Sequence, residues 1–137
     1  MVTAEDKLEI LDLISRFSHA FDGGDAEALA NVFVENGGYS ERIDGTDSVR
    51  GQGHIALKEY TKVETEKRGI SQPRHHVRNT VFFETSNDRV KTRSYFLATT
   101  VAGEGKLATS TASGIYEDTI IRTPAGWRIL KRIALYD

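Results

Sequence analysis

The spacing of apolar residues predicts an amphipathic helix at the start of the chain. Large apolar side chains recur every three or four positions, at Ile10, Ile14, Phe17 and Phe21, and Leu11 widens this stripe. Thr3 followed three residues later by Asp6 resembles a capping box, with Asp in place of the usual Glu. The pair Gly23-Gly24 then ends the helix.

Shorter elements follow this helix. Asp25 is a favourable N-cap for a second helix, Ala26 to Phe33. Asn36-Gly37-Gly38 is typical of a turn, and it leads into a short segment around Tyr39 to Ile43. A third, less regular helix is expected from about Gly53 to Lys67.

After Pro73 the pattern changes to the alternation of β-strands. Four segments show it: His75 to Glu84, Arg89 to Val101, Leu107 to Arg122 and Trp127 to Tyr136. The joints between them are made of turn-forming residues: Ser86-Asn87-Asp88, Gly103-Glu104-Gly105 and Thr123-Pro124-Ala125-Gly126. Helices followed by a strand meander predict an α+β fold, with the N-terminal helices packed on a curved antiparallel or mixed sheet. A long sheet of this kind curls into a cone whose inside is either filled or a pocket.

The composition limits the class of protein. The 137 residues suit a single domain spanning 1–137, and a formal net charge of −2 gives no footprint for nucleic acid. No apolar run approaches the length of a membrane span, and the N-terminus lacks the layout of a signal peptide. Without cysteine, disulfide and thiolate chemistry are excluded. We expect a cytoplasmic protein that handles a small molecule.

Asp22 is the first candidate for chemistry, because it follows the end of the apolar stripe. A carboxylate at the edge of the core loses part of its hydration, and it then becomes a usable base. The alternative is a helix C-terminal residue that hydrogen-bonds to its own loop, since Asp before Gly-Gly is common in turns.

His75 is the second candidate, because its position in the strand points it inward. Adjacent strand residues face opposite sides, so His75 shares a face with Val77, Asn79, Val81 and Phe83, whereas His76 faces outward. An inward imidazole needs a partner, and a carboxylate such as Asp22 would supply it. The alternative is a structural histidine that bonds to the backbone.

Other polar and aromatic residues allow two interpretations. Tyr39 and Tyr116 are either core aromatics or phenols that polarise a carbonyl from a pocket wall. Arg132 is either an ion-pair partner of a neighbouring strand or, if it faces the pocket, a substrate ligand. The four histidines lack the spacing of a metal site, and we expect no metal.

Several motifs occur together in a familiar order. They are Ile10-x2-Leu13-Ile14-x2-Phe17-x4-Asp22-x2-Asp25-x3-Leu29-x3-Phe33, Arg74-His75-His76-x2-Asn79, Gly114-x-Tyr116-x-Asp118 and Gly126-Trp127-Arg128-Ile129-x2-Arg132. Each alone is weak, but the set covers nearly the whole chain and resembles SnoaL-like proteins of the nuclear transport factor 2-like superfamily. The resemblance implies a cone-shaped α+β barrel with a deep pocket, which is often dimeric through the outer sheet face.

Within this superfamily, the chain looks most like the branch of scytalone dehydratase, hexachlorocyclohexane dehydrochlorinase and bile-acid 7α-dehydratase. Those enzymes eliminate without a cofactor, using an Asp–His dyad that matches Asp22 and His75. The dehydrochlorinase's last-strand arginine matches Arg132. Phe17 stands where the bile-acid enzyme has a tyrosine, and Phe21 where scytalone dehydratase has one. The second histidine of scytalone dehydratase falls at Phe96, so no particular substrate is implied.

These observations lead to a functional hypothesis. His75, polarised by Asp22, removes a proton from a small apolar, cyclic substrate in a lyase (dehydratase-like) or isomerase reaction that needs no cofactor. Arg132 or Tyr39 would stabilise negative charge, and the remaining substrate-binding residues would be Phe17, Phe21, Phe33, Val77, Asn79 and Tyr116. We expect a homodimer or homotrimer. The alternatives are a polyketide-type cyclase, a non-catalytic binding or assembly domain, and a ring-hydroxylating dioxygenase β subunit.

Overall fold

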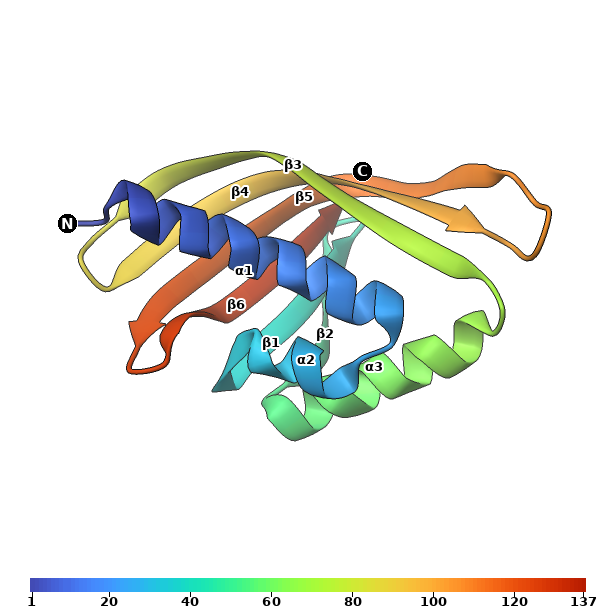
Figure 1. Cartoon of the computed structure of the whole chain (residues 1–137), viewed down its shortest axis with the longest axis horizontal. Coiled ribbons are helices and arrows are strands. Elements are labelled where there is room, and N and C mark those ends of the chain that lie inside the picture. Colours follow the sequence, from blue (N-terminus) through green and yellow to red (C-terminus); the bar gives the residue numbers. More distant parts are fainter.

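Three helices and six strands follow one another along the chain (Figure 1). A computed structural model describes residues 1–137, with the exception of the Glu84 side chain. The helices are α1 (Ala4–Gly23), α2 (Ala26–Asn31) and α3 (His54–Arg68). The strands are β1 (Phe33–Ile43), β2 (Thr46–Gln52), β3 (Gln72–Thr85), β4 (Arg89–Val101), β5 (Ala108–Thr123) and β6 (Gly126–Tyr136).

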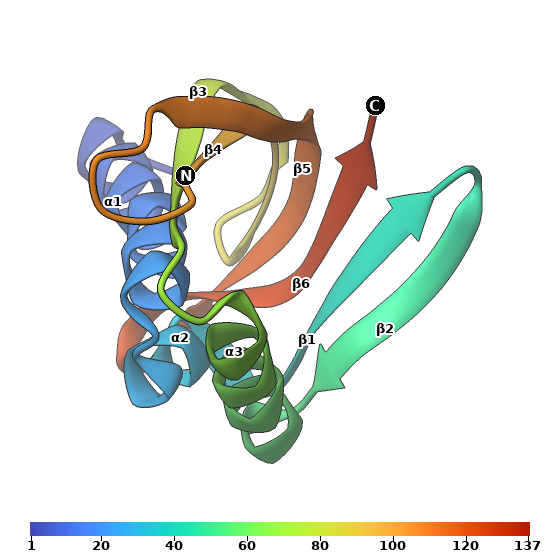
Figure 2. The ribbon, with the colours of Figure 1, turned by 90° about the vertical axis from the view of Figure 1, so that its right-hand side faces the viewer.

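The strands form one mixed sheet in the order β2-β1-β6-β5-β4-β3. Neighbours are antiparallel except β1 and β6, which run parallel. The sheet curls without closing, and α1 and α3 cover its inner side (Figure 2). The fold is therefore α+β with helices on the concave face of a curved sheet, as the sequence predicts.

The first helix confirms the sequence prediction at both ends. The Thr3 hydroxyl accepts a hydrogen bond from the Asp6 amide at 3.1 Å, and the Asp6 carboxylate accepts one from the Thr3 amide at 2.8 Å. Gly24 ends the helix in the left-handed conformation, with φ of 70°, which costs glycine little because it has no Cβ. Ile10, Ile14 and Phe17 of the predicted stripe are buried, but Leu13 and Ala20 complete the buried face, whereas Leu11, expected to widen it, is exposed.

The region after α1 differs from the prediction. The second helix ends at Asn31, and Phe33 already belongs to β1. The segment Asn36-Gly37-Gly38 lies inside β1, where the pairing with β6 shifts register, and is not a turn. A Cβ at Gly37 would lie 2.9 Å from the Ile129 carbonyl oxygen, so the glycine here serves close strand approach. The sequence pattern also fails to indicate β2, because this exposed edge strand is mostly polar.

The four strands expected in the second half are all present as β3 to β6, with ends that differ by at most three residues. The inward and outward faces of β3, however, exchange along the strand. Arg78 pairs with Tyr95 but Val81 pairs with Arg93, so β3 contains an extra residue at this point. Asn79 lies in this bulge with a φ of 56°.

The bulge corrects three side-chain placements. Asn79, Val81 and Phe83 were expected to share the inward face of His75, but all three are exposed. Phe82 packs against the core instead. Because strand side chains alternate with a period of two, one extra residue moves the side chains that follow it to the other face, up to the second register shift after Phe82.

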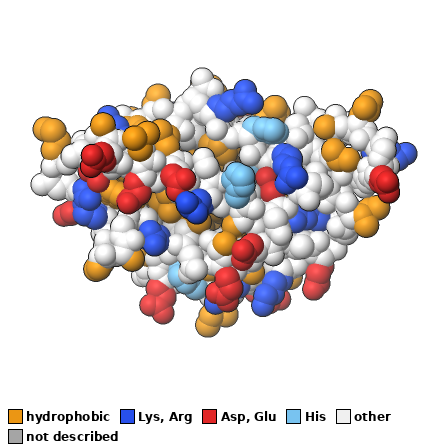
Figure 3. Space-filling view, in the orientation of Figure 1, with side chains coloured by type: hydrophobic (Ala, Val, Ile, Leu, Met, Phe, Trp, Pro, Cys, Tyr) orange, Lys and Arg blue, Asp and Glu red, His pale blue; other side chains and the backbone are white. Residues whose placement is uncertain are grey.

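The surface around the helices is electrically mixed. Acidic and basic side chains are interspersed on the face shown in Figure 3, with apolar side chains between them. Within the described chain, no helix combines the length and the apolar character that crossing a membrane requires.

Candidate active site

Asp22 and His75 meet where the last turn of α1 faces the inner side of β3. The Asp22 side chain is buried, and its two oxygens hold the same partner residue. Oδ1 lies 2.6 Å from His75 Nδ1, and Oδ2 accepts a hydrogen bond from the His75 backbone amide at 2.8 Å. One carboxylate therefore fixes both the ring and the backbone of the histidine.

This contact determines the protonation pattern of the imidazole. An ionised carboxylate only accepts hydrogen bonds, so Nδ1 carries the proton in the neutral ring, and the lone pair lies on Nε2. No hydrogen bond to Nε2 is present among the described residues, and the His75 side chain is 17 % exposed. The ring of Phe21 stands edge-on to the imidazole at 5.3 Å. Nε2 is thus oriented, partly desolvated and available to take a proton.

The backbone of Asp22 is held by α3 and by the start of β3. The Arg68 guanidinium donates from Nη1 to the Phe21 carbonyl at 3.0 Å and from Nη2 to the Asp22 carbonyl at 2.8 Å. Gln72 Nε2 donates to the same Asp22 carbonyl at 2.9 Å. These donors satisfy carbonyls that a helix end leaves free. Sequence reasoning missed both residues, because nothing local in a basic helix end shows which carbonyl it reaches.

Arg132 lies on the inner face of the sheet as an ion-pair partner of the neighbouring strand, the first of the two interpretations from the sequence. Its Nε and Nη2 donate to the two oxygens of Asp118 at 2.8 and 2.7 Å, and both side chains are fully buried. The guanidinium carbon lies 4.5 Å from the Phe17 ring centre and 4.0 Å from that of Tyr116. Nη1 is buried without a hydrogen-bond partner among the described residues.

The charge of Arg132 is secured by its partner. Burial alone would lower the pKa of the guanidinium, but the Asp118 carboxylate raises it above its ordinary value. Arg132 therefore stays cationic, and both N–H groups of Nη1 remain unbonded.

The predicted aromatic residues pack against one another inside the cone. Ring centres of Phe17 and Tyr39 are 5.5 Å apart, those of Phe17 and Phe33 are 6.0 Å apart, and those of Phe96 and Tyr116 are 4.5 Å apart. All five side chains are buried. Burial raises the pKa of Tyr39 and of Tyr116, so both phenols remain protonated donors. The cone is largely filled by its own side chains.

The accessible part of the interior is narrower than a deep pocket. Phe21, Tyr60, His75 and Val77 keep intermediate exposure, so the interior is reachable from solvent beside the dyad. A cavity of about 710 Å³ is a groove on another side of α1, between α1, α2 and the start of β6. That groove contains neither Asp22 nor His75, so the chemistry of the interior does not depend on it.

The remaining candidate residues lie apart from the dyad. Asn79 is exposed in the β3 bulge, so its expected inward position is wrong. His76 is on the outer face, where its Nε2 lies 3.2 Å from the Thr99 hydroxyl. Among the described side chains, no group of three or more His, Asp or Glu is arranged to hold a metal ion.

Comparisons with known proteins concern the family and the fold of the chain. Residues 2–133 match the sequence profile of the SnoaL-like domain. A protein of unknown function from Mycobacterium tuberculosis, Rv3472, is 26 % identical with a TM-score of 0.80, over 95 % of this chain and 70 % of that one. A second structure is a nuclear transport factor 2-like protein with a cystatin-like fold from Novosphingobium aromaticivorans. It is 25 % identical with a TM-score of 0.77, and the match covers 96 % of this chain and 82 % of that one.

A third solved structure extends the fold similarity. The protein Aln2 from a Streptomyces species has a TM-score of 0.83 at 22 % identity, over 98 % of this chain and 93 % of that one. At this identity the likeness concerns the fold alone. A search of curated proteins finds no match.

Proposed function

We propose a function that proceeds from family membership: the chain belongs to the SnoaL-like domain family, as its residues 2–133 match the profile of that domain. In this proposal the protein is a cofactor-free lyase or isomerase. It abstracts a proton from a small apolar, cyclic substrate with the Asp22–His75 dyad. The elimination would be of the dehydratase kind.

One observation carries the proposal: the carboxylate of Asp22 holds His75 through Nδ1 at 2.6 Å, and Nε2 has no described hydrogen-bond partner. Nε2 is not among the buried unpartnered atoms and the His75 side chain is 17 % exposed, so this nitrogen is open to a bound molecule. An oriented imidazole with an open Nε2 is the usual form of a general base.

The reaction is balanced without any other group. Nε2 takes a proton from the carbon next to a carbonyl, and the electron pair of the broken C–H bond moves onto the carbonyl oxygen to form an enolate. In a lyase, the enolate then collapses, the β C–O bond breaks, and the imidazolium returns the proton to the departing oxygen as water. In an isomerase, the imidazolium returns the proton to a different carbon. Asp22 stabilises the imidazolium in both cases.

The enolate needs a stabilising charge, and Arg132 supplies the best candidate. Its Nη1 has no hydrogen-bond partner among the described residues. Asp118 keeps the guanidinium charged, and the rings of Phe17 and Tyr116 pack against it. Tyr39 is the alternative donor, although its hydroxyl already donates to Glu41. A preorganised donor in a water-poor site stabilises developing charge more than solvent does.

The surroundings of the dyad favour an apolar ring as substrate. Phe21, Tyr60 and Val77 form the accessible surface beside His75, and buried aromatic rings continue it inward. Because Phe17 and Tyr116 are almost fully buried, a substrate that reaches Arg132 must displace part of this aromatic packing.

We further expect a homodimer or homotrimer, which analytical ultracentrifugation measures directly.

The filled interior favours one alternative function, a non-catalytic small-molecule binding or assembly domain. Such a domain would retain the Asp22–His75 contact as a structural link between α1 and β3. The two functions differ in a measurable way, because only a general base accelerates the exchange of carbon-bound hydrogen.

The test is hydrogen–deuterium exchange at the acidic CH₂ groups of 2-indanone, followed by NMR in D₂O. The wild-type protein should exceed the buffer rate, and His75→Ala should lower the protein-catalysed rate by about a hundredfold or more, the usual contribution of a general base. His76→Ala, which changes the adjacent outward imidazole, should exchange at the wild-type rate. A wild-type rate equal to buffer, or equal rates for wild type and folded His75→Ala, would reject the catalytic role.

A further inference from the structure

A second buried polar group lies on the inner face of β1, and the dyad mechanism does not use it. Glu41 is 7 % exposed, although it carries a carboxylate. Its Oε2 accepts hydrogen bonds from the Tyr39 hydroxyl at 3.1 Å and from the Tyr136 hydroxyl at 2.5 Å, and its Oε1 accepts one from Arg50 Nε at 2.5 Å. We call Glu41, Tyr39 and Tyr136 the β1 polar cluster.

Aromatic rings connect the β1 polar cluster with the dyad. The ring centre of Tyr39 is 5.6 Å from that of Tyr60, Tyr60 is 6.0 Å from Phe21, and Phe21 is 5.3 Å from His75. Tyr60 and Phe21 both retain intermediate exposure, whereas the residues behind them are buried. A row of packed aromatic rings therefore runs from the base at one end to the carboxylate at the other.

The cluster holds more donors than an ion pair between strands requires. Arg50 lies on β2, next to β1, and its side chain is 40 % exposed, so the Glu41–Arg50 contact alone would join these two strands. The two phenols come in addition, one of them from β6 and 95 residues away along the chain. Burying a carboxylate among aromatic rings costs free energy, which its hydrogen bonds offset.

The cluster also retains unused hydrogen-bonding capacity. A carboxylate offers about four acceptor sites, and Glu41 uses three of them, so one site remains on Oε1. The Tyr60 hydroxyl makes no hydrogen bond to a described residue, and it lies close enough to feel the Glu41 charge. Burial, and then this charge, raise the pKa of Tyr60, so the phenol keeps its proton. A free acceptor on Glu41 and a free donor on Tyr60, whose ring packs against that of Tyr39, together match one hydroxyl group, which donates and accepts.

We propose that the β1 polar cluster, together with Tyr60, binds a hydroxyl of the substrate at the end remote from the carbon that His75 deprotonates. The ligand class is a planar ring compound with a phenolic hydroxyl on the edge opposite its reactive carbon. A neutral hydroxyl suits the site better than an anion, because the carboxylate of Glu41 would repel a second negative charge. This inference rests on the proposed function for the reactive end, but its binding can be measured separately.

Two probes that differ by one group test it: 2-indanone and 5-hydroxy-2-indanone. Dissociation constants are measured by ¹H–¹⁵N NMR titration of the His75→Ala protein, in which the base is absent. The His75→Ala protein should bind 5-hydroxy-2-indanone at least about tenfold more tightly than 2-indanone, because one satisfied hydrogen bond to a charged group is worth about that factor. Adding Glu41→Gln should remove the preference and leave the affinity for 2-indanone unchanged.

The controls separate this inference from the proposed function. Glu27→Gln removes an exposed carboxylate from α2 that pairs with Lys58, and it should keep the preference. If Glu41→Gln fails to fold, Tyr136→Phe retains the carboxylate and its Arg50 contact, and it should reduce the preference at least threefold. Equal affinities for the two probes, or a preference that survives these Glu41 and Tyr136 changes, would overturn the inference. Absence of catalytic exchange would reject the proposed reaction without affecting this binding result.

Discussion

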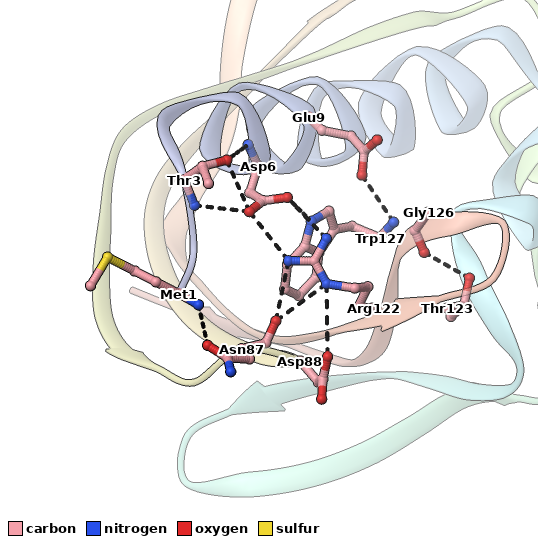
Figure 4. Close-up of polar contacts among 10 residues, drawn as sticks. All are labelled: Met1, Thr3, Asp6, Glu9, Asn87, Asp88, Arg122, Thr123, Gly126 and Trp127. Atoms are coloured by element: carbon pink, nitrogen blue, oxygen red, sulfur yellow. Dashed lines mark hydrogen bonds and ion pairs between the residues drawn. The ribbon is translucent and has the colours of Figure 1, made fainter.

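Both ends of α1 are joined to the sheet by an aspartate, but the two contacts differ in what they leave free. At the N-terminal end, the Asp6 carboxylate accepts from Trp127 Nε1 at 3.0 Å and from both Nη atoms of Arg122 at 3.1 and 3.2 Å (Figure 4). Thr3 adds further hydrogen bonds. At the C-terminal end, the Asp22 carboxylate has one partner residue, His75.

The N-terminal contact is a closed network. Arg122 also donates to the Asn87 carbonyl and lies 4.4 Å from the centre of the Trp127 ring. Glu9 accepts from the Trp127 backbone amide, and the Met1 ammonium donates to the Asn87 side chain (Figure 4). With its donors and acceptors used within the protein, this network contributes to stability.

The C-terminal contact is open, because it uses one imidazole nitrogen and leaves the other. The same residue type at the two ends of one helix therefore serves two purposes, and the partner decides which. An arginine or indole partner has only donors to offer, whereas a histidine partner presents a lone pair once its Nδ1 is fixed. Substitutions at each end should therefore separate into effects on stability and effects on activity.

The largest effect is expected for Asp22→Asn. The amide can donate to Nδ1, which favours the tautomer with the proton on Nε2 and removes the basic lone pair. The rate of 2-indanone exchange should fall by about a hundredfold to ten-thousandfold. A slowly exchanging downfield proton signal from Nδ1–H should be visible in wild type and lost in the variant.

Asp12→Asn is the matched control, because this carboxylate lies on the exposed side of α1 and pairs with Arg16. Its exchange rate should equal that of wild type. If Asp22→Asn keeps the wild-type rate while the protein remains folded, the dyad is a structural contact, and the distinction between the two helix ends fails.

A smaller effect, on stability rather than activity, is expected for Trp127→Phe. The change removes the indole donor to Asp6 and part of a side chain that is only 1 % exposed. The free energy of unfolding should fall by about 1–3 kcal/mol, from the lost hydrogen bond and the space left in the core. Urea unfolding measures this loss. The exchange rate per folded molecule should stay at the wild-type value, and a loss comparable to that of Asp22→Asn would contradict the separation.

The smallest effect concerns the pH dependence of stability. The hydrogen bonds from Arg122, the Thr3 backbone and Trp127 hold the pKa of Asp6 well below its usual range. A carboxylate whose pKa is lower in the folded state stabilises the protein above its ordinary pKa of about 3.9. This stabilisation is lost as the pH falls through the folded-state pKa.

Wild type should therefore melt a few degrees above Asp6→Asn at neutral pH, and the gap should close only below about pH 4. Thermal unfolding between about pH 2 and pH 7 measures both. High salt should narrow the gap at neutral pH, because the Arg122 side of the ion pair is exposed. A gap that stays constant down to the acid end of this range would show that the charge of Asp6 is not the cause.

Local patterns in the sequence predicted the elements that depend on neighbouring residues. The apolar stripe and the Thr3–Asp6 box identified α1, and strand alternation identified β3 to β6 and the inward position of His75. Alternation failed beyond Arg78, because a bulge inserts one residue and nothing in the local composition marks it. The edge strand β2 was missed for a related reason, as one exposed strand of polar residues has no periodic signal.

The sequence by itself thus determined the α+β class, the first helix, the last four strands and the residue types available for chemistry, because these follow from spacing and local propensity. The resemblance to a family suggested that Asp22 and His75 meet, but only the tertiary structure shows which side chains are in contact. Asp22 reaches His75 across 53 residues, and Glu41 receives the Tyr136 hydroxyl across 95. Such contacts depend on how the sheet curls, where it bulges and how helices pack on it, and these follow from the balance of the whole core.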